Sequence, residues 1–322
     1  MIYCRQLVFC LTLGGLAGLL PTSVLAQSCP DVSKEALKWL DRMSHSSHHI
    51  AYHGVVTLQR GDDMQVMQIS HSVNGDAASE ELTKLTGQGA QVIRERHPLQ
   101  CLHTGPRLLQ IETTLSASSS DNNCGVGRYY RFSVMPGERI AGRRAVTINV
   151  EPRDMYRYGY RMELDSETGL LLRSTTIGRG QIALERFQFA NLSYGSPLPA
   201  DISNEDVELI HEASHPDMTA AGTRVSPVAW ALGWLPSGFA VTEPTPGSRG
   251  RLTYTDGLAA FSVFVEPLST AIKPGEGVAR EGSTMSYTRG LELDGRPILV
   301  TVIGEVPVNT ARMVADSIHW MR

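Results

Sequence analysis

The hydrophobic residues of this chain recur at helical spacing in two short stretches. Residues 31–43 carry apolar side chains at this spacing, and Ser33 stands where an N-cap is needed. Residues 307–318 show the same spacing, and Pro307 stands at the start, where proline is tolerated in a helix. We therefore expect a short amphipathic helix near the start of the chain and another at its end.

Between residues 50 and 192 the period of the pattern changes to two. Tyr160 and Met162, for example, alternate with Arg161 and Glu163. Short glycine-bearing turns separate these runs, which favours antiparallel meanders over parallel strands joined by helices. The pattern predicts a large antiparallel sheet, strongly curved or barrel-like, with one polar face.

The chain of 322 residues is about twice as long as a typical domain, which indicates two domains. Residues 204–224 break the alternating pattern and hold five acidic residues and one arginine, as is typical of a linker. Further alternating runs precede the closing helix at 251–255, 258–266, 284–289 and 298–303. We expect an α+β, mostly β protein with a large β domain (27–203), an acidic linker (204–224) and a small α+β domain (225–322).

The first 26 residues have the features of a secretory signal peptide. Arg5 precedes a 14-residue apolar run over 7–20, and small residues lead to a cleavage site after Ala26. The apolar run is too short for a convincing membrane-spanning helix. The alternative is a lipid anchor on Cys29, but Ala26 stands where bacterial lipoproteins usually have leucine. We expect an exported protein whose mature chain begins at Gln27.

Export removes Cys4 and Cys10 and leaves Cys29, Cys101 and Cys124. Cys101 and Cys124 flank a serine-rich stretch, and a disulfide between them would stabilise the fold by roughly 3 kcal/mol in an oxidising compartment. The alternative is two independent buried thiols. Because the sequence contains no Cys-x-x-Cys, a thioredoxin-like redox role has no support.

Composition and motifs argue against nucleic-acid binding and against catalysis. The 29 basic and 33 acidic residues give a net charge of −4, which offers no general attraction to nucleic acid. The sequence lacks Gly-x-Ser-x-Gly, His-Glu-x-x-His and phosphate-binding glycine-rich loops, so we expect no enzyme, cofactor or metal. His45 and His49 would share a face in a longer helix, but we interpret this histidine-rich segment as a loop.

Arginine is concentrated between residues 128 and 161, where the sequence has eight arginines, three acids and no lysine. Guanidinium groups pair bidentately with phosphates and carboxylates, and tyrosines add amphipathic rings. The candidate residues for an anionic ligand or partner are Arg153, Tyr156, Arg157, Tyr158 and Arg161. One alternative is a solvated outer face, and another is pairing of Arg153 and Arg157 with Asp154 or Glu151. An apolar concave sheet face would also suit a lipid.

The same region carries a characteristic series of motifs: Glu-Pro-Arg-Asp, Tyr-Arg-Tyr-Gly-Tyr-Arg, Leu-Asp and Thr-Gly-Leu-Leu-Leu. These motifs occupy residues 151–154, 156–161, 164–165 and 168–172. They resemble the MucB/RseB family, periplasmic regulators of the envelope-stress sigma factor. Further similar segments, in the family's order, are 52–54, 60–62, 256–259, 262–267 and 302–307.

The resemblance implies an unclosed β-barrel similar to lipoprotein carriers, with helices across its mouth, and a small C-terminal domain. Family members are not enzymes. They bind the periplasmic segment of a membrane anti-sigma factor of the RseA/MucA kind and shield it from proteolysis, until lipopolysaccharide or other lipid releases them. The resemblance predicts a periplasmic protein with Asp256, Gly257 and Glu305 as candidate partner contacts, and it leaves a homo-oligomer open.

The alternative function is a periplasmic lipid or lipoprotein carrier without a dedicated anti-sigma partner. The recognisable C-terminal segments favour the regulator, because a carrier needs no partner domain. We expect the large domain to hold acyl chains and the small domain to help bind the anti-sigma factor. The sequence departs from the family pattern mainly at 97–115 and in the serine-rich loop.

Overall fold

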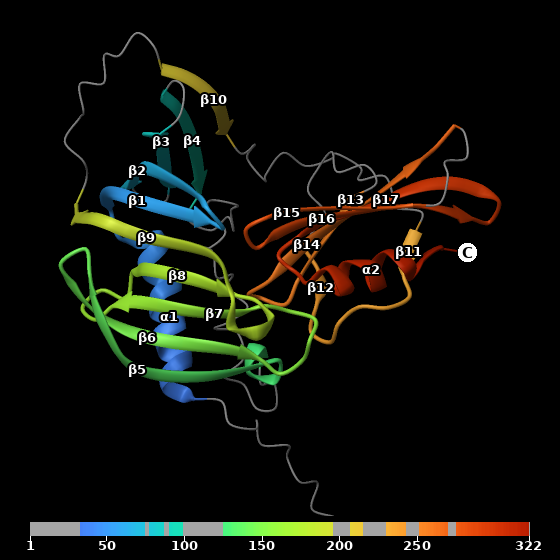
Figure 1. Cartoon of the computed structure of the whole chain (residues 1–322). Helices are drawn as coiled ribbons and strands as arrows, with labels where there is room; N and C mark the ends of the chain where they lie inside the picture. Colours follow the sequence, from blue (N-terminus) through green and yellow to red (C-terminus); the bar gives the residue numbers. More distant parts are fainter. Residues whose placement is uncertain are drawn as a thin grey trace, which may run out of the picture.

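The computed structural model contains two large sheets that lie side by side, each with a helix on one face, and a small two-stranded sheet (Figure 1). It describes residues 33–74, 77–86, 90–98, 125–195, 207–214, 230–242, 251–269 and 275–321. The predicted signal peptide, Cys29 and the Cys101–Cys124 disulfide lie outside these residues. Among the described residues no helix is long and apolar enough to cross a membrane.

The large domain is a ten-stranded curved sheet in the order β10-β4-β3-β2-β1-β9-β8-β7-β6-β5. Its strands are β1 (Tyr52–Arg60), β2 (Asp63–Asn74), β3 (Ala77–Lys84), β4 (Ala90–Pro98), β5 (Tyr130–Ile140), β6 (Arg143–Pro152), β7 (Gly159–Asp165), β8 (Leu171–Ile177), β9 (Ala183–Tyr194) and β10 (Val207–Ser214). Neighbouring strands are antiparallel except β10, which pairs parallel with β4. The large, curved, mostly antiparallel sheet expected from the alternating pattern is thus confirmed.

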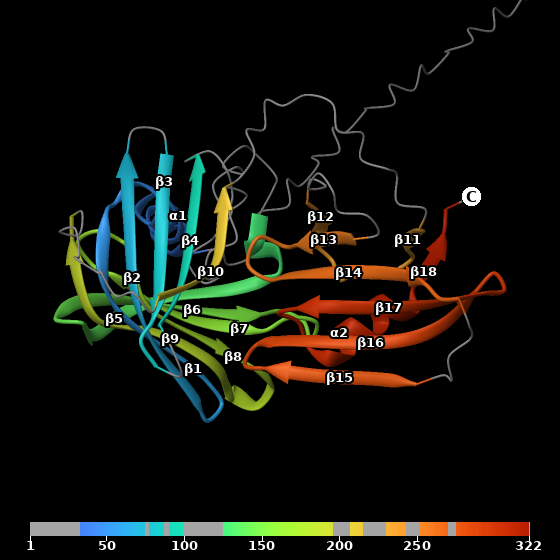
Figure 2. The ribbon, with the colours of Figure 1, turned by 90° about the horizontal axis from the view of Figure 1, so that it is seen from above.

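Helix α1 (Lys34–His49) lies across the concave face of this sheet (Figures 1 and 2). The Ser33 hydroxyl accepts a hydrogen bond from the Ala36 amide at 3.2 Å, so the predicted N-cap is correct. Ala36, Leu40 and Met43 are fully buried against the strands. This apolar face explains why the helix forms, since a helix of this length is marginal without tertiary packing.

The helix continues to His49 instead of ending at residue 43, so the histidine-rich loop interpretation was wrong. Ser46 and Ser47 are buried, and the Ser46 hydroxyl donates to the Thr168 carbonyl at 2.5 Å. Tertiary contacts of these polar residues therefore extend the helix. The His45 and His49 rings stack on its outer side with centroids 4.3 Å apart, and no cluster of three or more potential metal ligands is present in the described part of the chain.

The segment expected to be an acidic linker contains strand β10, which extends the large sheet. Seven of its eight residues, between Val207 and Ser214, pair with β4, and one register irregularity lies between Leu209 and His211. Pairing with β4, an element far away in the sequence, places this strand at the edge of the sheet. The acidic composition therefore did not reveal it.

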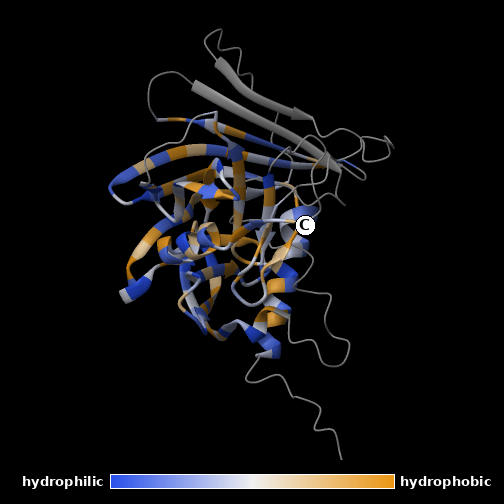
Figure 3. Ribbon diagram, turned by 90° about the vertical axis from the view of Figure 1, so that its right-hand side faces the viewer, coloured by the Kyte–Doolittle hydropathy of each residue, from blue (hydrophilic) through white to orange (hydrophobic). Residues whose placement is uncertain are grey.

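The small domain is a six-stranded antiparallel sheet in the order β12-β13-β14-β17-β16-β15. Its strands are β12 (Ala240–Val241), β13 (Arg251–Thr255), β14 (Ala260–Pro267), β15 (Glu276–Glu281), β16 (Thr284–Leu293) and β17 (Arg296–Gly304). Helix α2 (Val308–Asp316) packs on one face, and β11 (Trp230–Leu232) pairs with β18 (Ile318–Trp320). Hydropathy alternates along the strands (Figure 3), and burial follows it in β17, where Ile298, Val300 and Val302 are fully buried.

Candidate functional site at the contact between the two domains

Arg157 lies between β6 and β7, and its side chain is completely buried where the two domains meet. Its Nη1 donates to Asp256 Oδ2 of the small domain at 2.6 Å, and its Nη2 donates to the Ser237 carbonyl at 2.6 Å. Its Nε donates to Asp154 Oδ1 of its own domain at 3.1 Å. One guanidinium thus joins acceptors from both domains. We call Arg157, Asp154, Asp256 and Tyr130 the interdomain cluster.

Aromatic rings from both domains surround the Arg157 guanidinium. Its central carbon lies 5.0 Å from the ring centre of Tyr129, 5.4 Å from that of Tyr130 and 5.1 Å from that of Phe239. The Tyr130 hydroxyl donates to Asp256 Oδ2 at 2.8 Å. Burial, followed by the charge of Asp256, raises the pKa of Tyr130 well above its ordinary value, so the hydroxyl keeps its proton.

Asp256 is held in place by its own turn. Its Oδ1 accepts hydrogen bonds from the backbone amides of Leu258 and Ala259 at 2.9 and 2.8 Å. Gly257 has a φ of 96°, which other residues rarely adopt. The turn therefore leaves Oδ2 directed at Arg157 and Tyr130. Removing one partner of a buried ion pair typically costs about 3–5 kcal/mol, because the other charge is left unpaired.

Residues on either side of Arg157 also bind the small domain. The Tyr158 hydroxyl donates to the Val306 carbonyl at 3.1 Å and accepts from Arg280 Nη2 at 3.0 Å. The Tyr156 carbonyl accepts from the Thr310 hydroxyl of α2 at 2.9 Å. The segment 156–158 is thus bonded to the small domain at each of its residues.

A second polar contact joins the domains near the start of β9. Glu185 Oε2 accepts from the Ser283 amide at 3.3 Å and from the Ser283 hydroxyl at 3.0 Å. Arg60 connects Glu185 of its own domain, at 3.3 Å, with Glu281 of the small domain, at 2.7 Å. Two separate polar contacts therefore define the relative position of the domains.

A different cluster attaches α1 to the turn between β7 and β8. Buried Asp165 accepts from the Tyr194 hydroxyl at 2.5 Å and from Arg143. Burial acts to raise the pKa of Asp165, but these hydrogen bonds and the Arg143 charge outweigh it and lower the pKa. Gly169 has a φ of 85° and lies directly against Arg42 of α1. This turn is thus shaped to receive the helix.

An open pocket of about 660 Å³ lies between the first half of α1 and the β5–β6 hairpin. Trp39, Val134 and Val146 form apolar parts of its lining, and Arg139 and Arg144 contribute positive charge. Glu35 and Glu138 also line it, so the pocket combines apolar side chains with charges of both signs, and its size falls within the range of small-molecule sites. Next to the pocket, α1 packs against the concave face of the sheet.

Comparisons with known proteins agree with this two-domain architecture. The family model of the MucB/RseB N-terminal domain matches residues 35–208, and that of the MucB/RseB C-terminal domain matches residues 224–319. The chain belongs to the MucB/RseB family. Its two domain matches fall on the two sheets of the structure.

Two relatives illustrate how far the similarity extends. The sigma factor AlgU regulatory protein MucB of Pseudomonas aeruginosa is 33% identical over 295 residues, 88% of this chain and 91% of the relative. The sigma-E factor regulatory protein RseB of Haemophilus influenzae is 24% identical over 87% of this chain and 90% of its own length. Both are named as regulatory proteins rather than enzymes.

Solved structures of MucB share the fold. MucB in complex with MucA(peri) superposes with a TM-score of 0.67 at 31% identity, over 89% of this chain and 99% of that chain. A second MucA/MucB complex, from Pseudomonas aeruginosa, gives 0.66 with the same identity and coverage. MucB alone gives 0.59 at 30% identity, over 90% of this chain and 99% of that chain.

In this MucB/RseB protein, the characteristic motif residues form the contact between the domains. Tyr156, Arg157 and Tyr158 meet the small domain directly, and Asp256 meets Arg157. Glu305 is nearly buried beside the same contact, where its charge adds to the effect of burial in raising the pKa of Tyr160. The sequence placed these residues in two separate candidate sites, and the structure joins them in one.

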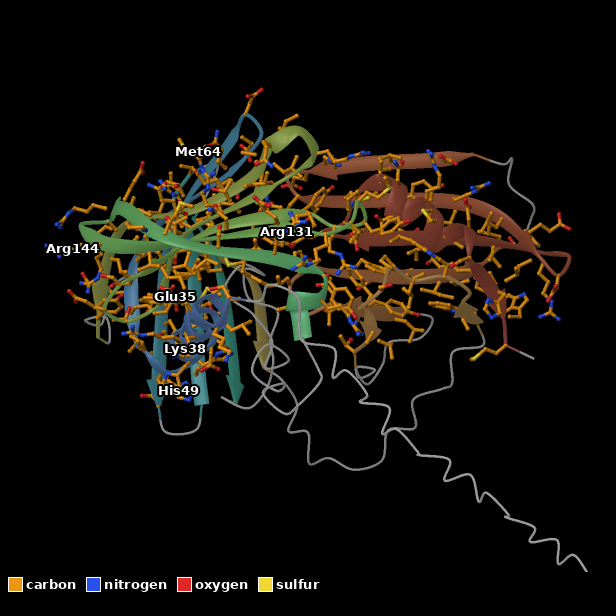
Figure 4. All side chains as sticks on the ribbon, turned by 90° about the horizontal axis from the view of Figure 1, so that it is seen from below. Glu35, Lys38, His49, Met64, Arg131 and Arg144 are labelled. Atoms are coloured by element: carbon orange, nitrogen blue, oxygen red, sulfur yellow. The ribbon has the colours of Figure 1, made fainter. Side chains whose placement is uncertain are left out.

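The predicted arginine site is not formed as one exposed patch. Arg157 is occupied inside the protein, which corrects its assignment to an external ligand and confirms the alternative pairing with Asp154, at 3.1 Å. Arg161 is exposed and donates to Asn149, and Arg153 donates to the Tyr130 carbonyl. Exposed Arg131 and Arg144 lie at opposite ends of the β5–β6 hairpin (Figure 4).

The sequence pattern did not single out four residues that complete the contact: Ser237, Phe239, Glu185 and Ser283. It indicated Tyr129 and Tyr130 only as ring-bearing members of the arginine-rich stretch. They come from elements far apart in the sequence. Asp256 and Arg157, for example, are 99 positions apart. Neither periodicity nor composition reports such a pairing.

Proposed function

We propose that this protein is a periplasmic regulator that binds the periplasmic segment of a membrane anti-sigma factor and shields it from proteolysis, thereby controlling the envelope-stress response. The observation that carries the proposal is the full-length match to MucB in complex with MucA(peri), which spans both domains. The regulatory names of the relatives support it. The signal-peptide pattern of residues 1–26 supports the location.

The test measures binding of the mature full chain to the periplasmic segment of its neighbouring anti-sigma factor, by calorimetry, and protection of that segment from proteolysis. We expect a saturable complex and slower cleavage. A chain that binds no anti-sigma segment yet extracts lipid from vesicles would favour the carrier instead. Comparable protection by a fragment of residues 27–203 would contradict a role for the small domain.

We further propose that lipid or lipopolysaccharide releases the partner through the pocket beside α1. The apolar part of the lining suits an acyl chain, and Arg139 and Arg144 can pair with a phosphate although Glu35 and Glu138 line the same pocket. The double variant Arg139→Gln/Arg144→Gln is expected to need several-fold more lipopolysaccharide for release. The matched control is Arg179→Gln, which removes an exposed arginine elsewhere on the domain. Equal release by wild type and double variant would contradict this route.

Arg153 and Arg161 remain candidates for an anionic ligand or acidic partner residues. Charge-assisted hydrogen bonds are worth about 1.5–3 kcal/mol each, so Arg153→Gln/Arg161→Gln should weaken binding several-fold or more. The loss should shrink with added salt, because Arg161 is exposed. Unchanged melting together with unchanged affinity for both the anti-sigma segment and lipopolysaccharide would show that neither arginine contacts these ligands.

A further inference from the structure

The interdomain cluster is satisfied in one relative position of the domains. The planar guanidinium of Arg157 has donors in fixed directions, and its three groups meet Asp154, Asp256 and the Ser237 carbonyl together. Asp256 in turn uses Oδ2 for Arg157 and Tyr130. A small rotation of one domain would break these bonds while the charges stay out of reach of water.

Such a contact has two favourable arrangements rather than a continuous range. In the closed arrangement every charge is paired, and in a fully open arrangement both Arg157 and Asp256 are hydrated. Intermediate positions leave a buried charge unpaired, which is strongly unfavourable. A purely apolar interface would not discriminate in this way, because apolar contact is non-directional. The chemistry of the cluster therefore separates a closed from an open state.

The solved MucB structures superpose on this chain to different extents. This chain superposes on the two MucA-bound MucB structures with TM-scores of 0.66 and 0.67, and on MucB alone with 0.59. Coverage and identity are nearly equal in the three cases, so this chain superposes better on the two MucA-bound structures than on MucB alone. The closed arrangement described here is nearer to the MucA-bound shape.

We propose that the interdomain cluster holds the two domains in the arrangement that binds the anti-sigma segment, and that opening the cluster weakens this binding. The inference rests on the proposed function. For a partner that contacts both domains, the apparent dissociation constant equals the intrinsic constant divided by the fraction of protein that is already closed. A variant that is closed about one tenth of the time would therefore bind about tenfold more weakly.

Asp256→Asn tests the proposal in the full mature chain. The amide keeps the shape and an oxygen for the turn amides, but it removes the charge and sets an NH2 group near Arg157. We expect a larger radius of gyration by small-angle X-ray scattering and an affinity for the anti-sigma segment lowered about tenfold. Tyr130→Phe removes one hydrogen bond to Asp256 and should give a smaller change in the same direction. It serves as the second variant if Asp256→Asn fails to fold.

The matched control is Asp316→Asn, which removes an exposed carboxylate paired with Arg289 on the same domain and should change neither quantity. A wild-type radius of gyration in both cluster variants would refute the closed-to-open change. A changed radius with unchanged affinity would refute its coupling to the partner. If the wild type itself binds no anti-sigma segment, the proposed function and the coupling both fail, while scattering still decides whether the cluster sets the domain arrangement.

Discussion

Gly238→Ala is expected to damage the contact between the domains without changing any charge. Gly238 lies in the small domain with a φ of 94°, in the left-handed region. A Cβ atom there would lie 2.2 Å from Cε2 and 2.4 Å from Cζ of the Tyr129 ring of the large domain. These distances are far inside van der Waals contact. The ring or the whole small domain must therefore move.

The magnitude follows from two contributions. The left-handed backbone costs a residue with a Cβ about 1–2 kcal/mol. Overpacking against a fixed neighbour costs about 1–3 kcal/mol more. Gly142→Ala is the matched control, because Gly142 has a φ of 78° and no atom within 4 Å of the added Cβ. We expect a loss of about 2–5 kcal/mol for Gly238→Ala and about 1–2 kcal/mol for Gly142→Ala.

The assay is urea unfolding of the mature full chain, followed by fluorescence and fitted by linear extrapolation for each transition. Small-angle X-ray scattering of the folded variants reports whether the clash is relieved by displacing a domain. We expect Gly238→Ala to lose more free energy of unfolding than Gly142→Ala, to change the scattering profile more, or both. If the two variants match in both measurements, Gly238 does not pack against Tyr129 as described.

Three further predictions concern the large domain and the termini. The lowered pKa of Asp165 stabilises the fold above the ordinary aspartate pKa of about 4, and this contribution is lost as the pH falls below that value. Asp165→Asn should therefore lower the stability at neutral pH. It should also flatten the pH dependence of the melting temperature between about pH 2 and 6. Mass spectrometry of the exported protein should give a mature chain that starts at Gln27, whereas a diacylated Cys29 would contradict signal cleavage after residue 26. Non-reducing peptide mapping should find Cys101 joined to Cys124, and alkylation of both as free thiols would refute the pairing.

Much of the architecture could be predicted from local patterns. The period of two marks strands such as β7, where Tyr160 and Met162 are buried and Arg161 is exposed, although Glu163 is buried too, paired with Arg173. Short turns between such strands leave few alternatives to an antiparallel sheet. The first helix was also predictable at its start, because the Ser33 cap and the Leu40 face are local features.

The tertiary structure alone decided the end of that helix and the role of the motif residues. Ser46 looks like a loop residue in the sequence, but its hydroxyl bonds to the Thr168 carbonyl, 122 positions away. Arg157 looks like a surface residue, but Asp256 neutralises it inside the protein. A polar side chain is buried when distant groups supply its hydrogen bonds. Which groups arrive depends on how the two sheets meet, and local periodicity carries no information about that.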